Sequence, residues 1–142
     1  MTKHKNILLP QKIATLSLLA LGAFITIRGL YFVVNQENII YESEFYTTLY
    51  RMMPMWIWGA LLIVFGFLII LASCFFGKRS TNNISNYCML IGGAGGAIIY
   101  FFIASASIYN TINWISPAQF ITTTAWLCFI SFLGGSDIYA RR

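Results

Sequence analysis

"MWIWGALLIVFGFLIILASCFF", residues 55–76, decides the fold because it carries no charged side chain and no proline. A helix rises about 1.5 Å per residue, so about twenty residues cross the roughly 30 Å hydrocarbon core of a bilayer. The stretch lacks the alternation of apolar and polar residues that a barrel strand needs, and unpaired backbone groups are unfavourable in lipid. We therefore expect residues 55–76 to form a membrane-spanning helix.

Three further apolar runs of similar length surround this one, over about residues 13–34, 88–109 and 118–138. They predict an all-α membrane protein in which four transmembrane helices form an antiparallel bundle. Residues 1–142 then make up a single integral membrane domain. The predicted connections are an external loop at 35–54, a cytoplasmic loop at 77–87 and a second external loop at 110–117.

The composition supports lipid as the surrounding solvent. Of the 142 residues, 58% are hydrophobic and 9% are charged, and the mean hydropathy is +0.73. Soluble proteins carry roughly 25% charged residues, so a water-soluble fold of this size could not hide so much apolar surface. The net charge is +5, but the basic residues are too scattered to follow a phosphate backbone. The lipid bilayer is therefore the expected partner, and nucleic acid is not.

The positive charges predict the orientation. The predicted external loops contain one cation, Arg51, whereas seven lie in the predicted cytoplasmic segments: Lys3, Lys5, Lys12, Lys78, Arg79, Arg141 and Arg142. Cytoplasmic segments of membrane proteins are enriched in Lys and Arg, so both termini should be cytoplasmic in a multi-pass protein of the cell membrane. The first apolar run is too long for a cleavable signal peptide, and we expect it to remain as a helix.

The first external loop contains an amphipathic segment, "NIIYESEFYTTLYRMM", residues 38–53, with apolar side chains at helical spacing: Tyr41, Phe45, Leu49 and Met52. This pattern predicts a short helix in the headgroup plane. Pro54 follows, where a new helix can begin. Indole rings are enriched at membrane interfaces, so we interpret Trp56, Trp58 and Trp114 as an interfacial belt. An aromatic ligand site is the alternative for these tryptophans.

Small residues predict how the helices pack. In "IGGAGGAIIYFFIASAS", residues 91–107, Gly92 and Gly96 are four apart, as are Gly93 and Ala97. Such spacing leaves a narrow groove for a neighbouring helix, either within the chain or in another copy. Small residues also recur every seven positions in the first two runs: Thr15, Gly22 and Gly29, then Gly59, Gly66 and Ser73. A period of seven indicates left-handed packing at about +20°.

Arg28, in "AFITIRGLYFVV", is an intramembrane charge. Arginine in hydrocarbon is unfavourable by about 2.5–3.5 kcal/mol on insertion scales, so a partner is expected. The candidate partners are carboxylates or hydroxyls: Glu37, Glu42 and Glu44, or Ser105, Ser107 and Thr122 to Thr124. Two interpretations stay open. Arg28 lines a polar cavity, an anion path or a contact with another subunit, or it is a structural residue paired inside the chain.

Residues for bond chemistry are scarce. His4 is the single histidine, the three cysteines Cys74, Cys88 and Cys128 lack CxxC spacing, and Asp137 is the sole acid outside the first external loop. No pair of carboxylates is placed for acid–base catalysis. We predict no catalytic, cofactor or metal site, and a protein that is not an enzyme.

Three known families provide comparisons. "LGAFITIRGLYF" resembles the glycine-plus-arginine first helix of the small fluoride channels, but their second-helix asparagine and third-helix phenylalanine–threonine signature are missing. The first-helix glutamate of small multidrug exporters is also missing. The chain is similar to phage holins and small prophage membrane proteins in size, helix number and charged tails, a likeness of architecture alone.

Two classes of function remain from the sequence. The first is a subunit or accessory docking factor of a larger membrane assembly, which binds other subunits or copies of itself through the glycine groove, Arg28 and the outer amphipathic helix. The second is an oligomeric, holin-like pore lined by serines and threonines of the third and fourth helices. The first is favoured because water-filled pores need more polar lining than these helices offer.

Overall fold

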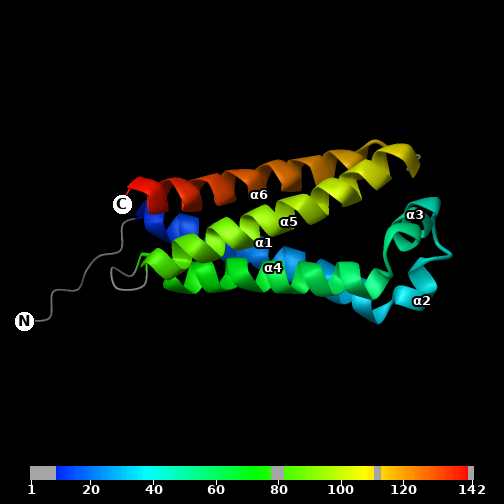
Figure 1. Ribbon diagram of the computed structural model, residues 1–142, viewed down its shortest axis with the longest axis horizontal. Coiled ribbons are helices and arrows are strands. Elements are labelled where there is room, and N and C mark those ends of the chain that lie inside the picture. Colours follow the sequence, from blue (N-terminus) through cyan, green and yellow to red (C-terminus); the bar gives the residue numbers. More distant parts are fainter. Residues whose placement is uncertain (1–8, 78–81, 111–112, 141–142) are drawn as a thin grey trace, which may run out of the picture.

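The computed structural model describes residues 9–77, 82–110 and 113–140, and these residues form helices and no strands. The helices are α1 (Leu9–Val34), α2 (Gln36–Ile39), α3 (Glu44–Met52), α4 (Met55–Phe75), α5 (Asn82–Asn110) and α6 (Ile115–Ala140). In Figure 1 the four long helices lie side by side, and α2 and α3 lie together at one end of them. We call this the α3 end. At the opposite end α1 begins and α6 ends.

Within the described residues, α1, α4, α5 and α6 are long and apolar enough to cross a membrane. The shortest, α4, has 21 residues and therefore rises about 31 Å, which matches the roughly 30 Å hydrocarbon core. Large apolar side chains point away from the protein along these helices: Ile27 is 66% exposed, Phe67 54% and Phe132 70%. A soluble protein would shield such residues. The chain is an all-helical, multi-pass membrane protein.

The long helices extend beyond the predicted apolar runs. The first apolar run predicts a helix from about residue 13, but α1 begins at Leu9. The third run predicts a helix from residue 88, but α5 begins at Asn82. Hydropathy marks the part of a helix that suits hydrocarbon, whereas polar turns continue the helix into water. The end of α4 differs for a local reason. Gly77 has a φ of +79°, a backbone conformation that favours glycine, and the chain turns there.

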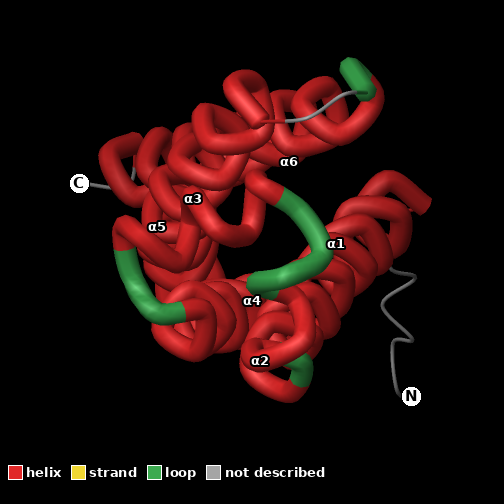
Figure 2. Tube along the Cα trace, turned by 90° about the vertical axis from the view of Figure 1, so that its right-hand side faces the viewer, coloured by secondary structure: helices red, strands yellow, loops and turns green. Residues whose placement is uncertain are grey.

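Extensive contacts join the long helices in the order α1–α4–α5–α6, and α1 and α6 share no such contact. Figure 2 shows the arrangement along the helix axes, with α1 and α6 on separate sides of the bundle and α3 over its end. The central position of α5 is reflected in its burial. Half of its apolar window is buried inside the protein, compared with 28% for α1 and 22% for α6.

The closest helix pair is α1 with α4, which we call the α1–α4 seam. A Cβ atom added to Gly29 would lie 2.7 Å from the carbonyl oxygen of Gly59, and one added to Gly59 would lie 2.6 Å from that of Gly29. Two turns nearer the start of α1, a Cβ added to Gly22 would lie 2.9 Å from the carbonyl oxygen of Gly66. These glycines lie seven apart on each helix, so the backbones touch at regular intervals.

The glycines of α5 lie against its two neighbours in the chain. A Cβ on Gly92 would lie 3.2 Å from the carbonyl oxygen of Phe65 in α4. A Cβ on Gly93 would lie 2.8 Å from the carbonyl oxygen of Leu127 in α6. A Cβ on Gly96 would lie 3.3 Å from the Cδ1 atom of the same leucine. Ala97 is buried beside them. This surface is therefore occupied by α4 and α6 of the same chain.

Candidate functional site: the groove between α1 and α6

Two adjoining hollows lie between α1 and α6, and Ser17 and Trp126 line both. We call them together the α1–α6 groove. The hollow toward the α3 end has a volume of about 730 Å³, and the hollow toward the opposite end about 500 Å³. Both fall within the roughly 300–1,000 Å³ of known ligand pockets. The groove is thus large enough to hold a ligand or a segment of another chain.

The side chains of the groove are small, polar or aromatic. Toward the α3 end it is lined by Ala20, Phe24, Arg28, Trp114, Ala118, Gln119, Thr122 and Thr123, among others. The glycines of α1 are buried and lie against α4, so the lining that α1 gives to the groove contains no glycine. Because no glycine register joins α1 to α6, their backbones stay apart and a groove remains.

Arg28 is the charged residue of the hollow at the α3 end. Its Cζ atom lies 4.4 Å from the centroid of the Phe120 ring in α6, a cation–π contact. The Nε atom is buried and has no hydrogen-bond partner among the described residues. The structure describes no ion pair for this guanidinium either. Arg28 is therefore positioned by an aromatic ring, with its charge unneutralised by the described chain.

Aromatic residues from three helices surround this position. Phe120 stacks on Phe45 of α3, with ring centroids 5.9 Å apart and planes at 15°, and it lies 6.3 Å from Tyr100 of α5. Tyr100 is fully buried and its hydroxyl has no partner among the described residues. Tyr46 of α3 is close enough to be influenced by Arg28. Burial raises the pKa of its phenol above 10.0, and Tyr31 adds to this while Arg28 opposes it.

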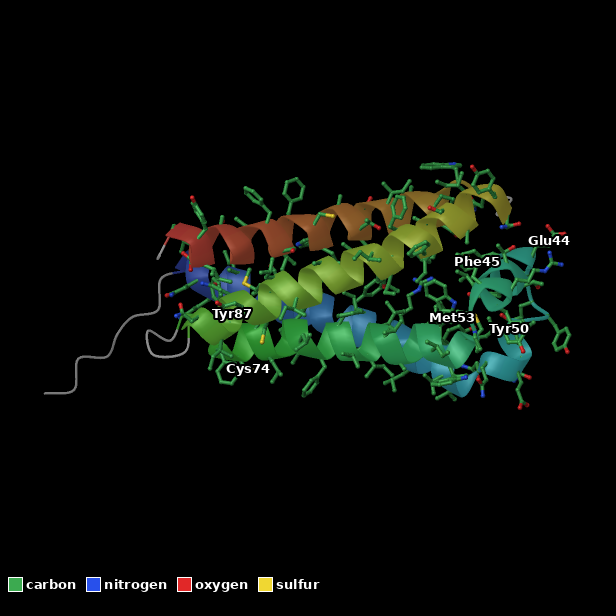
Figure 3. The ribbon with its side chains drawn as sticks, in the orientation of Figure 1. Glu44, Phe45, Tyr50, Met53, Cys74 and Tyr87 are labelled. Atoms are coloured by element: carbon green, nitrogen blue, oxygen red, sulfur yellow. The ribbon has the colours of Figure 1, made fainter. Side chains whose placement is uncertain are left out.

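The predicted carboxylate partners lie elsewhere. Glu37, Glu42 and Glu44 are exposed, and none forms an ion pair with Arg28 in the described structure. Figure 3 shows why for Glu44: it lies on the outer side of α3, and Phe45 lies on the side toward the long helices. The apolar face of α3 therefore closes the end of the bundle and keeps the acids away from Arg28.

The predicted hydroxyl partners are also engaged. Thr122, Thr123 and Thr124 each donate to the carbonyl oxygen four residues earlier, at 2.8 Å, and Ser105 does the same at 2.9 Å. Ser107 is buried. Hydroxyls in transmembrane helices commonly bond their own backbone in this way. None of the described bonds joins these side chains to Arg28.

The α3 helix is bound to the bundle by apolar contacts and by one tryptophan. Phe45 and Leu49 are buried, while Tyr41 and Met52, expected on the same apolar face, are 90% and 56% exposed. Trp58 is 3% exposed and its Nε1 donates to the carbonyl oxygens of Leu49, at 3.2 Å, and Met53, at 3.0 Å. The Ser43 hydroxyl caps the start of α3 by accepting from the Phe45 amide.

The position of Trp58 differs from the predicted interfacial belt. Trp56 and Trp114 are 52% and 78% exposed near the α3 end, whereas Trp58 points into the protein. Residues two apart on a helix are separated by about 200° around its axis, so Trp56 and Trp58 cannot share one face. The sequence pattern contained this signal.

The opposite end of the groove contains Asp137, the one acidic residue within α1, α4, α5 and α6. Asp137 of α6 accepts a hydrogen bond from the side-chain amide of Asn86 in α5, and both line the hollow there together with Gln11. Nothing in the sequence singled out Asn86, because an amide near the polar start of a helix forms no distinctive pattern. From the sequence, Asp137 is expected to meet Arg141, Arg142 or water, and both arginines lie outside the described residues.

Other residues singled out from the sequence are far from this site or beyond description. Cys74 and Cys128 are exposed and Cys88 is half-buried, each as a free thiol. The residues outside the described ranges include Lys3, His4, Lys5, Lys78 and Arg79. No protein-family model, no curated protein and no solved structure matches the chain.

Proposed function

We propose that this chain is a non-enzymatic docking subunit of a larger membrane assembly, and that the α1–α6 groove is its docking site. It would lie in the cell membrane as an antiparallel four-helix bundle with both termini cytoplasmic. The α3 end would then face outward, with α3 in the headgroup region. The observation that carries the proposal is Arg28, which lines an open groove and has no described counter-ion.

Energetics favour a partner for Arg28. An arginine at the centre of a membrane-spanning helix is unfavourable by about 2.5–3.5 kcal/mol, and a desolvated cation–π contact returns about 2 kcal/mol of that. The Phe120 contact therefore leaves part of the unfavourable free energy in place. A partner that brings an anion into the groove would remove it, and it would also cover the exposed faces of α1 and α6.

The pore alternative has less support from the described side chains. The hydroxyls of Ser105 and Thr122 to Thr124, which would line such a pore, already donate to carbonyl oxygens of their own helices. The glycine surface of α5 is covered within the chain, so assembly of copies would need another face.

The proposal is tested with Arg28→Leu and a matched control, Arg51→Leu. Arg51 lies exposed on α3, so the control removes the same charge outside the groove. Native gels of solubilised membranes should show the wild type and Arg51→Leu in one high-mass complex and Arg28→Leu released from it. The stability of the purified Arg28→Leu chain should change by about 1 kcal/mol or less, since lost cation–π contact and relieved desolvation oppose each other.

Two results would contradict the proposal. The first is an Arg28→Leu protein that stays in the same complex as the wild type. The second is depolarisation of cells, measured with a membrane-potential dye, when the chain is expressed alone. That result would assign the chain to the pore-forming class.

A further inference from the structure

We infer that the occupant of the α1–α6 groove is a single transmembrane helix of another protein, with a carboxylate at the level of Arg28. This inference rests on the proposed docking function and specifies the chemistry of the partner. It follows from the length of the groove, its small side chains and its charge.

The length of the groove favours a spanning helix over a lipid. Its lining on α1 runs from Gln11 to Arg28, which corresponds to about 26 Å at about 1.5 Å per residue. One leaflet of a bilayer contributes only about half of the roughly 30 Å hydrocarbon core. A phospholipid therefore reaches along half of the groove, whereas a transmembrane helix fills all of it.

The side chains of the groove suit the approach of a helix backbone. Ala14, Ser17 and Ala20 follow each other at spacings of three on α1, and Ala118 lines the groove from α6. Small residues at such spacing let a second helix come close, as the glycines do in the α1–α4 seam.

The charge of the groove specifies the carboxylate. Arg28 is the cation of the hollow at the α3 end, and the described residues provide no anion for it. An intramembrane cation is commonly paired with an acid on a neighbouring helix. Arg28 lies six residues before the last residue of α1, about 9 Å below that end, so the acid is expected about six residues inside its own helix.

A second copy of this chain does not supply such an acid. The sequence contains four acidic residues: Glu37, Glu42, Glu44 and Asp137. The three glutamates lie on or beside the short helices α2 and α3, beyond the end of α1, and Asp137 lies near the opposite end of α6. None is at the level of Arg28 on a long helix. The partner is therefore a different protein.

The inference is tested with the full-length protein in phosphatidylcholine vesicles and synthetic transmembrane peptides. The probe is a Leu/Ala helix with one Glu about six residues from its outer end and photoreactive leucines along its length. Its matched peptides carry Leu at that position, or Glu near the inner end instead. Cross-linking yield is measured against peptide concentration, and the cross-linked residues are mapped by mass spectrometry.

We expect the outer-Glu peptide to reach half-maximal cross-linking at about tenfold lower concentration than either matched peptide, as one interhelical polar contact allows. Its cross-links should map to groove residues such as Phe24, Thr122 and Trp126. Arg28→Leu should remove this preference, and Arg51→Leu should retain it.

Three results would overturn the inference. Equal yields for the Glu and Leu peptides would show that no carboxylate is selected. Cross-links on the exposed faces of α4 and α5 would show that the groove is not the binding surface. A Glu preference that disappears in vesicles containing an anionic phospholipid would assign Arg28 to an anionic lipid headgroup. In each case, a native complex that still depends on Arg28 would leave the docking function standing with a different ligand.

Discussion

The two sides of α1 differ in how closely another helix approaches. On one side, Gly22 and Gly29 meet Gly66 and Gly59 of α4 so tightly that an added Cβ would lie 2.6–3.0 Å from a carbonyl oxygen. On the other side, Ala20, Phe24 and Arg28 line a groove toward α6. One helix therefore carries a completed interface and an open one.

The difference shows what directs helix association in lipid. Apolar surface on both sides is equally compatible with acyl chains, so hydrophobicity does not distinguish them. Backbone approach does, because glycines seven apart allow continuous van der Waals contact along the α1–α4 seam. The groove side has no such register within the chain. It has an unneutralised charge instead, which an external partner can complete.

The largest expected effect breaks the seam and leaves the groove intact. In Gly29→Leu the new Cβ would meet the backbone of Gly59, which cannot move aside as a flexible side chain can. We expect the unfolding free energy to fall by about 3 kcal/mol, the upper part of the range for overpacked cores. The measurement is equilibrium unfolding in mixed micelles with increasing sodium dodecyl sulfate.

Ala20→Leu is the matched control on the same helix. Ala20 is exposed and lines the groove, so the added side chain meets no packed backbone. Stability should change by less than about 0.5 kcal/mol, as for most surface substitutions. Similar losses of unfolding free energy in Gly29→Leu and Ala20→Leu would show that both sides of α1 are packed equally tightly, and the distinction between the seam and the groove would be wrong.

A smaller effect is expected where α3 closes the groove end. Trp58→Phe keeps a ring in place but removes the Nε1 donor to the carbonyl oxygens of Leu49 and Met53. Loss of this hydrogen bonding should destabilise the protein by about 1 kcal/mol. Hydrogen exchange should quicken in α3, while the amides of the α1–α4 seam keep their protection.

The control for this prediction is Trp56→Phe, since Trp56 is 52% exposed and has no described hydrogen bond. It should leave the exchange of α3 unchanged. If Trp58→Phe quickened exchange in α1 and α4 as much as in α3, the tryptophan would support the whole bundle. The distinction between the seam and the groove end would then be lost.

The sequence predicted the parts of this fold that depend on composition and spacing. Apolar length located the long helices, and the seven-residue spacing of Gly22, Gly29, Gly59 and Gly66 marked residues that meet in the α1–α4 seam. The groove could not be predicted in this way. It arises because α1 and α6 share no extensive contact, and a missing contact leaves no pattern along the chain.

Side-chain partners were the other limit of sequence reasoning. Arg28 was identified as exceptional from its place in an apolar run, but its neighbours depend on the three-dimensional position of α3. Once Phe45 and Leu49 turn inward, the nearby glutamates face outward and Phe120 becomes the contact of Arg28. Charge complementarity read along the chain therefore suggested acids that the fold directs elsewhere.

The smallest expected effect concerns Tyr100, one of the aromatic residues near Arg28. The Tyr100 hydroxyl is buried without a described partner, and an unpaired buried hydroxyl is unfavourable. Tyr100→Phe should therefore raise the unfolding free energy of the isolated chain by up to about 1 kcal/mol, in contrast to the losses above. Tyr109→Phe is the control, since Tyr109 is 87% exposed and should give no change. A loss of stability in Tyr100→Phe would mean that the hydroxyl is hydrogen-bonded in the isolated protein. A polar group near Arg28 would then have its partner within the chain, and the surroundings of Arg28 would depend less on an external partner.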